Sequence, residues 1–501
     1  MAIWVVILIS LSISTLLIFF FSRKSHHNFP PGPPRIPIIG NLLWLRQSIS
    51  KLEPILRSLH TKFGPILTLH AGPYSAIFIG DRFLAHQALI QNGTTFADRP
   101  PFIATNKVIT NRPTSIVTSP YSPTWRVLRR NLAEFVLQPS RLKLRLNSLT
   151  LAMNMLLESL NDSQENQFND KFRHAVFVLF VFMCFGDKLD RKKIEEIEYI
   201  QRRKLLNFGQ FNVLNLWPRV AKIVFRKSWN ELVQVRQKQE EILAPLIREK
   251  MNERVLKGSE NGSILSYLDT LLDLHLPHGS RKLDEGEIIS LCSEFLSAGP
   301  DTTSTALQWI MANVVKNPSI QEKLFMEIKG VVRDGDREVK EDALQGLDYL
   351  KAVILEGLRR HPPSHFLIPH SVAKDTKLGG YFIPKKGIVS FSVTEISWDP
   401  KVWEDPMTFN PERFVNNNGN GDEIFNIKGN KEIKMIPFGA GRRICPGYGL
   451  AMLALEYFVA NLIWNFEWKA VDEEGVDLSE KQEFTVVMKN PLKAQITPRF
   501  M

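Results

Sequence analysis

The chain has 501 residues, of which 44% are hydrophobic, 23% charged and 10% aromatic, and this is a globular composition throughout. It holds only three cysteines, Cys184, Cys292 and Cys445, which excludes a disulfide framework and every zinc or iron–sulfur site with several cysteine ligands. Lys and Arg (63) exceed Asp and Glu (52) by eleven, so the admissible partners include an anionic membrane, a nucleic acid and an acidic protein.

Residues 3–21 form an uncharged apolar run without proline. In a helix, this run spans about 30 Å, the thickness of the hydrocarbon core of a bilayer. Arg23 and Lys24 follow the run and no basic residue precedes it, so the amino terminus is expected in the lumen and the rest in the cytosol. A cleaved signal peptide is the alternative, but the run is long and lacks both a basic region before it and a small-residue cleavage site. We therefore expect one transmembrane anchor over residues 1–22.

Residues 23–40 combine the basic pair with the string PPGPP at positions 30–34. Proline locks φ and lacks an amide donor, so this segment cannot continue a helix and is expected to act as a stiff hinge. A disordered linker is the alternative, but apolar Ile36, Ile38 and Ile39 follow closely and can be buried. No composition break and no internal repeat follows, which predicts one domain over 41–501.

Helical periodicity predominates in that domain, and examples of predicted helices are 54–62, 124–137, 142–160, 229–255, 284–316, 320–332 and 349–360. Strand-like runs are few and short: 66–69, 76–79, 381–383 and 388–392. Cys184 and Cys292 lie in apolar or helical surroundings and are expected in the core. We therefore expect a mainly α fold with a minor β-sheet portion.

The most informative motif is the loop at 438–447, whose sequence is FGAGRRICPG. Its glycines let the backbone lie close against a flat ligand and leave amides free to donate to a thiolate. Arg442 and Arg443 make the surroundings of Cys445 electropositive, which favours that thiolate. Taken alone, the residues also admit a glycine-rich loop with a buried structural cysteine.

The whole string resembles the axial-ligand loop of the cytochrome P450 superfamily, the haem-thiolate monooxygenases, and the match rests on Phe438, Gly441, Arg443, Cys445 and Gly447. The resemblance implies the cytochrome P450 fold and haem b (iron-protoporphyrin IX) as cofactor. It further implies that Cys445 is the axial ligand of the haem iron, whose electron donation favours O–O cleavage. Arg443 would then donate to a haem propionate.

A second motif is EGLR at 356–359, which places Glu356 and Arg359 on one face of a helix. Alone, such a pair is a weak signal because surface helices carry many of them. The string PERF at 411–414 resembles the partner segment of the same family. The resemblance implies a buried ion network of Glu356, Arg359 and Arg413 with a structural role.

The third motif is WRVLRR at 125–130, where Trp125 and Arg129 share one helical face and Arg126 and Arg130 share the next. A basic amphipathic helix on an anionic surface is the alternative. The resemblance assigns Trp125 and Arg129 to the haem propionates. It leaves Arg126 and Arg130 outward, where an acidic electron donor would dock.

The fourth motif is AGPDTT at 298–303, within a helix predicted to start at a capping box formed by Asp284 and Glu287 and to stop before Pro318. Small Ala298 and Gly299 are expected to leave room for a flat cofactor or a bound small molecule.

This string resembles the oxygen-binding groove of the family, which implies that Thr302 stabilises activated oxygen and that Asp301 relays protons to it. Without that context, a mid-helix threonine more commonly bonds back to the preceding turn. Pro300 departs from the usual pattern, because a proline inside a regular helix costs about 3 kcal/mol. We expect it to fix a kink at the groove.

The segments that resemble the substrate pocket of the family are mostly apolar, which predicts a hydrophobic substrate. The expected lining residues are Phe102, Ile103, Phe208, Phe211, Leu296, Ala298, Phe366, Leu367, Val486 and Val487. Glu294 is expected to supply one polar contact or to form a salt bridge.

The matches cover nearly the whole chain and resemble the plant microsomal (A-type) group, closest to plant P450 family 89. This implies a single-pass enzyme of the endoplasmic reticulum membrane that uses dioxygen and takes electrons from NADPH through NADPH–cytochrome P450 reductase. It would oxidise a hydrophobic plant metabolite and would not bind nucleic acid. Two alternatives are a haem-thiolate isomerase or dehydratase that needs no reductase, and a membrane-anchored haem- or lipid-binding protein without oxygenase activity.

Overall fold

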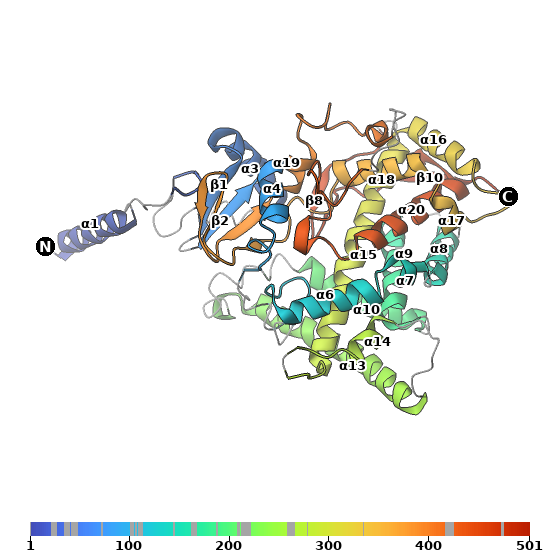
Figure 1. Cartoon of the computed structure of the whole chain (residues 1–501), viewed down its shortest axis with the longest axis horizontal. Helices are drawn as coiled ribbons and strands as arrows, with labels where there is room; N and C mark the ends of the chain where they lie inside the picture. Colours follow the sequence, from blue (N-terminus) through green and yellow to red (C-terminus); the bar gives the residue numbers. More distant parts are fainter. Residues whose placement is uncertain are drawn as a thin grey trace.

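The computed structural model describes residues 2–21, 28–34, 41, 49–71, 74–100, 105, 108, 114–143, 146–161, 168–186, 189–207, 211, 222–257, 266–277, 279–333, 335–415, 425–471 and 475–500. Helix α1 (Ala2–Phe21) extends away from the rest of the protein, and the two chain ends lie at opposite extremes (Figure 1). A sheet-rich part lies on the side of α1 and a larger helical part lies beyond it.

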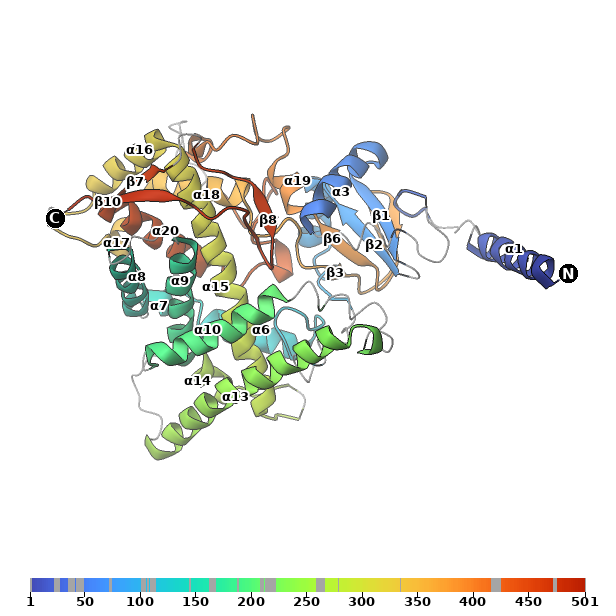
Figure 2. The same cartoon turned by 180° about the vertical axis from the view of Figure 1, so that it is seen from behind.

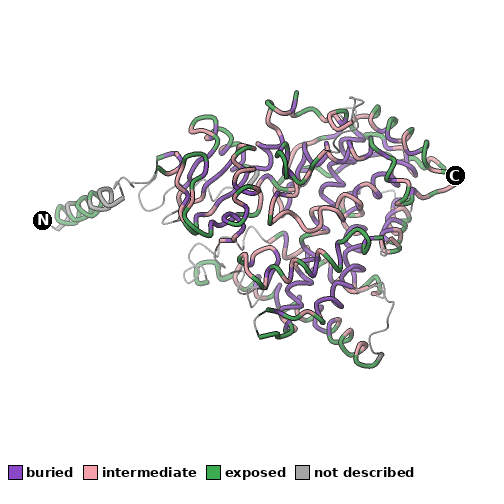
Figure 3. Tube along the Cα trace, viewed as in Figure 1, coloured by how far each residue is buried: buried purple, intermediate pink, exposed green. Residues whose placement is uncertain are grey.

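The helical part is built around α15 (Glu285–Lys316), a helix of 32 residues that is about 48 Å long. It packs against α9 (Phe168–Phe185), α10 (Arg191–Leu206), α13 (Arg226–Lys257), α18 (Asp348–Arg360) and α20 (Tyr448–Asn465). Seen from behind, α10 and α13 cross the lower half of α15 (Figure 2). Helix α15 is buried along most of its length, and the burial-coloured trace shows buried segments concentrated in the interior of the helical part (Figure 3).

The remaining helical elements surround this core. They are α3 (Ile49–Phe63), α4 (Arg82–His86), η1 (Gln87–Gln91), α6 (Pro123–Phe135), α7 (Pro139–Lys143), α8 (Leu146–Asn161), α14 (Tyr267–Leu272), α16 (Pro318–Lys329), α17 (Glu341–Leu344), α19 (Val393–Ser397), η2 (Pro411–Phe414) and η3 (Gly441–Arg443).

The main sheet has the strand order β1-β2-β6-β3 and comprises β1 (Ile66–Ala71), β2 (Tyr74–Ile79), β6 (Ile388–Phe391) and β3 (His370–Ser371). β1 pairs with β2 and β3 pairs with β6 in antiparallel fashion, whereas β2 and β6 run parallel. Three two-stranded antiparallel sheets join β4 (Thr376–Leu378) with β5 (Tyr381–Ile383), β7 (Phe466–Ala470) with β10 (Ala494–Pro498), and β8 (Glu480–Gln482) with β9 (Val486–Met488).

The long central helix follows the sequence prediction closely. Asp284 accepts the backbone N–H of Glu287, and the Glu287 carboxylate accepts the N–H of Asp284, which is the predicted capping box. The helix ends before Asn317, and it runs unbroken through Pro300, which is buried. Cys184 and Cys292 are free and buried, as expected.

The described part of the predicted hinge, residues 28–34, is attached to the sheets. The N–H of Thr68 donates to Pro31 O at 2.8 Å, and the N–H of Phe382 donates to Asn28 O at 2.7 Å. A Cβ on Gly32 would lie 2.1 Å from Thr68 O, so only glycine permits this close approach.

A membrane anchor was predicted over residues 1–22 from their apolar sequence. Within the described ranges, no helix is sufficiently long and apolar to count as a membrane span. The transmembrane anchor over 1–22, the hinge over 23–40 and the catalytic domain over 41–501 therefore stay predictions from the sequence.

Candidate active site

The loop around Cys445 is held by backbone geometry that favours glycine. Gly439 and Gly441 have φ values of 71° and 70°, in the left-handed region. A Cβ on Gly441 would also lie 2.0 Å from the carbonyl oxygen of Leu89, so this contact excludes every other residue. The N–H of Cys445 donates to Phe438 O at 2.8 Å and closes the loop. The loop thus presents Cys445 in a single backbone conformation.

The electrostatics at Cys445 combine burial with positive charge. Burial raises the pKa of the thiol, while the N–H of Gly447 and the guanidinium of Arg129 act against that rise. Helix α20 begins at Tyr448, so its amino-terminal end also lies next to the sulfur. A bound metal ion deprotonates a coordinating thiol outright, and these surroundings would then stabilise the thiolate.

Three further residues predicted for the site meet beside the loop. The guanidinium of Arg443 stacks over the ring of Trp125 at 4.1 Å and donates to the carbonyls of Ala97 and Ser119, each at 2.7 Å. Arg129 donates to the carbonyl of the residue before Cys445. Burial lowers the pKa of Arg443 to about 10 and also lowers the pKa of Arg129.

Two residues of this cluster were given no role from the sequence. Arg99 donates to Val117 O at 2.9 Å and to Ile368 O at 2.9 Å, and burial together with the charge of Arg443 lowers the pKa of Arg99 to about 9. His370 shares a hydrogen bond of 2.7 Å with Phe96 O. Burial, with Arg99 nearby, lowers the pKa of His370 to about 3. The signal in the sequence was a basic residue next to a proline in each of two short strings, FADRP and IPH.

The charge balance of this cluster fits an anionic ligand. Arg99, Arg129 and Arg443 form no ion pair in the part of the chain that the structure describes, and their acceptors are backbone carbonyls. Asp98 uses its Oδ1 to accept the N–H groups of Arg99 and Tyr121 instead. Buried cations without a counter-ion are costly, so the residues present fit the two propionates of a haem whose iron meets Cys445.

The predicted ion network is present, because Glu356 contacts both Arg359 and Arg413. Arg359 donates Nε to Glu356 Oε2 at 2.6 Å and Nη2 to Oε1 at 2.8 Å, and both side chains are fully buried. Arg413 lies 3.5 Å from Glu356, and the N–H of Asn410 donates to Glu356 at 2.8 Å. Trp398 donates to the carbonyls of Arg359 and its neighbour at the end of α18.

The oxygen-groove motif lies on the one accessible stripe of α15. From Glu287 to Val315, every residue of this helix is buried except Glu294, Ala298, Gly299 and Thr302. The first, second and fourth of these are four residues apart, so they share a helical face. Because neighbouring elements cover the rest of α15 from Glu287 to Val315, this stripe is its one accessible surface there.

The expectation for Gly299 was wrong. A Cβ at Gly299 would lie 1.9 Å from the ring of Phe180 on α9, so the space beside this glycine is filled by that ring and does not accommodate a ligand. Gly299 permits the close packing of α9 on α15. Ala298, in contrast, keeps an accessible surface on the stripe.

The hydroxyl of Thr302 bonds back to the preceding turn, as is common for a threonine within a helix, and Thr302 also lies on the accessible stripe. Its Oγ1 donates to Ala298 O at 2.8 Å and contacts Gly299 O at 3.2 Å. The next helical face carries Asp301, which is buried.

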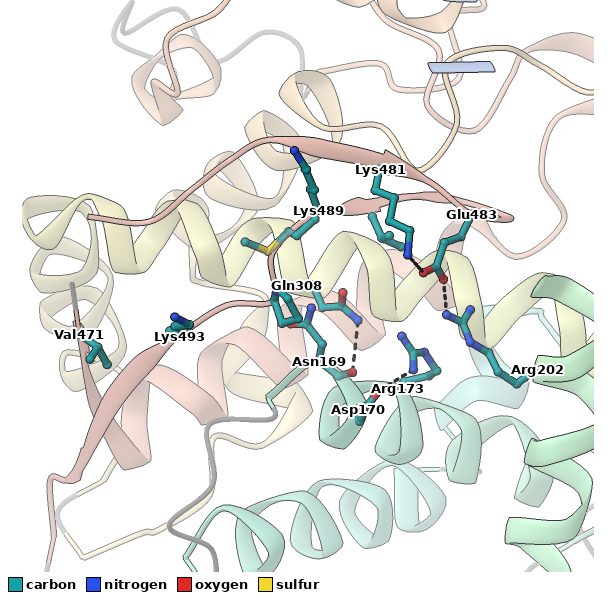
Figure 4. A pocket seen from close by; sticks show the side chains of 13 residues that line it. Asn169, Asp170, Arg173, Arg202, Gln308, Val471, Lys481, Glu483, Lys489 and Lys493 are labelled. Carbon is teal, nitrogen blue, oxygen red and sulfur yellow. Dashed lines mark hydrogen bonds and ion pairs between the residues drawn. The ribbon is translucent and has the colours of Figure 1, made fainter. Parts of the chain in front are cut away.

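Asp301 is part of a polar network on the helical face next to the stripe. Arg202 donates to Oδ1 at 2.9 Å and Thr485 donates to Oδ2 at 2.9 Å. Burial raises the pKa of Asp301, and Arg202 partly opposes this. Arg202 also pairs with Glu483, which bonds to Lys481, and all three side chains line an open pocket of about 950 Å³ (Figure 4). Only Arg202 therefore stands between Asp301 and that pocket.

The predicted substrate-pocket residues are distributed unevenly. Phe102, Ile103 and Phe208 lie outside the described residues. Leu367 lies next to the cysteine loop, 3.7 Å from the position of a Cβ on Gly439, and Phe366 contacts Phe78 edge-on.

Other members of the predicted pocket lie apart from that group. Phe211 is buried in a small separate cluster, Leu296 is in the main core, and the carbonyl of Val486 accepts Trp309 Nε1 at 2.8 Å. Val487 lines the pocket of Figure 4.

Glu294 forms no ion pair within 4.0 Å among the described residues. Its Oε1 accepts the N–H of Val117 at 2.7 Å, and Ser115 and the N–H of Ile116 also donate to it. Glu294 thereby anchors the loop whose carbonyls hold Arg99, Trp125 and Arg443.

Comparisons with known proteins agree with this geometry. The family model described as Cytochrome P450 matches residues 30–498. The chain is 48% identical to Cytochrome P450 89A9 of Arabidopsis thaliana over 98% of this chain and 97% of that protein. It is 30% identical to Tabersonine 16-hydroxylase 1 of Catharanthus roseus, over 94% of this chain and 91% of that one.

A solved structure of a zebra fish cytochrome P450 with abiraterone superimposes with a TM-score of 0.75 at 25% sequence identity, covering 89% of this chain and 99% of that one. The family match extends over nearly the full length, and the fold is that of the family, mostly helical with a small sheet portion. The chain therefore belongs to the cytochrome P450 family and is a haem-dependent monooxygenase of plant P450 family 89.

Proposed function

We propose that this P450 hydroxylates a hydrophobic plant metabolite, using dioxygen and electrons that NADPH–cytochrome P450 reductase takes from NADPH. The observation that carries this is the accessible stripe of α15, which comprises Ala298 and Thr302 on a helix that is buried at nearly every other position from Glu287 to Val315. A plant hydroxylase among the relatives supports the reaction type. The reductase is the usual electron donor of the resembled family.

The haem would be held by residues of four segments. Cys445 would bind the iron, and Trp125, Arg129 and Arg443 would hold the propionates, together with Arg99 and His370. Gly441 and Gly447 would keep the loop close to the ring, and Phe438 would pack beside the sulfur. When bound, haem supplies the redox chemistry that activates dioxygen.

The protein's own contribution to oxygen chemistry is proton supply. We infer that the Thr302 hydroxyl turns from Ala298 O to donate toward the open space. Asp301, one residue away and with a pKa raised by burial, would hold a proton and receive its replacement from water, while Arg202 holds the carboxylate in place. The exit to solvent would be the pocket of Figure 4.

The substrate would lie between the stripe and the apolar segments near the cysteine loop. Phe366 and Leu367 are half-buried and adjoin that loop, so they would contact the substrate directly. The other predicted members, Phe102, Ile103, Phe208, Phe211, Leu296, Val486 and Val487, would complete or support the pocket. An apolar lining excludes water and orients the molecule with few polar contacts.

The partner surfaces follow from charge and sequence. Arg126 and Arg130 are exposed on α6, next to the buried Trp125, and would attract the acidic face of the reductase. The apolar segment 1–22 would anchor the enzyme in the endoplasmic reticulum membrane with its catalytic domain in the cytosol.

The test is turnover of candidate plant metabolites by the purified haem protein with reductase. Product that requires NADPH, reductase and dioxygen together would support the proposal. Product formed from a peroxide substrate without reductase would instead show an isomerase or dehydratase, and haem binding without any turnover would show a binding protein.

A further inference from the structure

A half-buried lysine lies close to the open stripe, about one and a half to two and a half turns from Thr302. Lys204 is in the last turn of α10, and its Nζ donates to the hydroxyls of Ser293 and Ser297 on α15 at 2.9 and 3.0 Å. The Lys204 side chain keeps some accessible surface, and both hydroxyls that it contacts are buried. The ammonium is therefore held where α10 packs against α15.

The ammonium of Lys204 has no carboxylate partner. Within the residues that the structure describes, no Asp or Glu oxygen comes within 4.0 Å of Nζ. The nearest acid by electrostatic effect is Glu294, whose carboxylate is occupied by the loop at 115–117. On α13, Arg236 adds a second positive charge, and it is paired with Glu240 at 2.7 Å.

The charge of Lys204 survives its burial at neutral pH. Burial lowers the pKa of Lys204 to about 8, Glu294 opposes this and Arg236 adds to it. The group is thus still largely protonated at pH 7. A buried cation with two neutral hydroxyls as partners is poorly stabilised and is well suited to bind an anion.

A second unsatisfied group lies one turn away. Gln201 is buried, its Oε1 accepts from Ser293 and Ser297 at 3.1 and 3.0 Å, and its amide nitrogen has no partner. The same two serines therefore connect Gln201 and Lys204. This cluster, formed by Gln201, Lys204, Ser293 and Ser297, is polar and electropositive, beside a pocket whose predicted lining is apolar.

We propose that Lys204 binds a carboxylate of the substrate, so that this enzyme selects apolar molecules that carry a carboxylate at a defined distance from the oxidised carbon. The inference rests on the proposed function and names its substrate class. Ser297 and Ser293 lie five and nine residues before Thr302, which is about 8 to 14 Å along the helix axis. The carboxylate is therefore separated from the site of oxidation by about this distance.

The test uses the full-length, haem-loaded protein and spectral titration of the haem Soret band. The probes are decanoic, dodecanoic and tetradecanoic acids, each compared with its methyl ester at neutral pH. We expect at least one acid to bind about 10- to 100-fold more tightly than its ester, because a charge-assisted hydrogen bond in a buried site replaces hydroxyl contacts. The acid is also expected to raise the thermal unfolding temperature more than the ester does.

Three variants test whether Lys204 is responsible for the tighter binding of the acid. Lys204→Met removes the charge at nearly constant volume and is expected to abolish the acid preference while ester binding is kept. Lys204→Arg is expected to retain part of it. Lys192→Met removes an exposed lysine from the same helix and is expected to change nothing.

The outcomes separate this inference from the proposed function. Equal affinity for acid and ester in the wild-type protein at every chain length would overturn the role of Lys204, as would an acid preference that persists in Lys204→Met. The carbon monoxide spectrum of each variant reports haem-thiolate binding independently. A normal spectrum with no acid preference therefore contradicts only the substrate class, whereas a missing haem-thiolate spectrum contradicts the proposed function.

Discussion

The protein has two groups of arginines with little exposed surface, and the two groups have different kinds of partner. Arg359 is fully buried with a bidentate carboxylate partner, and Arg413 approaches the same carboxylate. Arg99, Arg129 and Arg443 bond only to backbone carbonyls. The first group is complete within the chain and is structural. The second forms no ion pair among the described residues and is balanced only in part by Asp98, so its charge suits an added anion.

The same reasoning extends to Lys204. Among the described residues its ammonium also has no carboxylate within 4.0 Å, and it lies beside the accessible stripe of α15. We propose that the first cationic position serves the cofactor and the second the substrate.

The largest effect on stability is expected where the arginines have a carboxylate partner, at Arg359 and Arg413. Glu356→Gln leaves Arg359 buried without its counter-charge and is expected to destabilise the protein by about 3–5 kcal/mol. Urea unfolding followed by circular dichroism measures this. The matched control is Glu412→Gln, which removes an exposed partner of Lys323 and is expected to cost less than about 1 kcal/mol. Similar losses in the two variants would contradict the structural role.

Substitutions among the arginines that bond to backbone carbonyls, Arg99, Arg129 and Arg443, are expected to have a different effect. Arg443→Gln removes a charge but keeps amide donors, so the stability of the haem-free protein is expected to change by less than about 1 kcal/mol. Haem release to a scavenging apoprotein is expected to become about 10-fold faster, because one charged hydrogen bond to a propionate is lost. Arg442→Gln, at the exposed neighbour, is the control. A large loss of apoprotein stability in Arg443→Gln would place this arginine with the structural group.

The pH dependence of stability is expected to distinguish the haem-free and haem-loaded forms. Burial, then Arg99, lowers the pKa of folded His370 from 6.5 to about 3, so below pH 6.5 the unfolded chain binds a proton that the folded chain does not. Stability contributed by neutral His370 is therefore present above pH 6.5 and is lost as pH falls toward 3. Between pH 6.5 and 5 the loss is about 2 kcal/mol.

Bound propionates would favour protonated His370 and reduce this loss. Urea unfolding of both forms at several pH values, with His370→Phe as reference, measures the difference. An identical pH dependence in the two forms would show that no anion binds beside His370.

A smaller effect is expected from the outward charges of α6. Replacing exposed Arg126 and Arg130 by Glu is expected to slow reduction by the reductase several-fold at low salt, and the difference is expected to vanish at high salt. Stopped-flow reduction measures the rate, and Lys192→Glu on α10 is the control. A difference that is insensitive to salt would contradict an electrostatic docking surface.

The features that the sequence predicts best are those that depend on residues close together in the chain. The capping box at Asp284, the end of α15 before Asn317 and the inward and outward faces of α6 all follow from neighbouring residues. Helix α9 was not predicted as a helix, because it is buried on nearly every side from Ala175 to Cys184 and its sequence shows no polar face.

Contacts between distant segments could not be predicted from the sequence. Gly299 was expected to leave room for a ligand, but Phe180, which fills that room, is more than a hundred residues away. Asp301 was expected to act together with Thr302, whereas its hydrogen-bond partners in the structure are Arg202 and Thr485. Lys204 had no distinguishing pattern, since only the folded chain shows that no carboxylate reaches it.

The central claim is that Cys445, inside a cluster of unbalanced cations, holds a haem iron as its thiolate ligand. The most direct measurement is the carbon monoxide difference spectrum of the reduced protein, recorded for the wild type and for Cys445→Ser. We predict the thiolate-specific Soret band in the wild type and its absence in the variant. A wild-type protein without that band, or a variant that keeps it, would contradict the account.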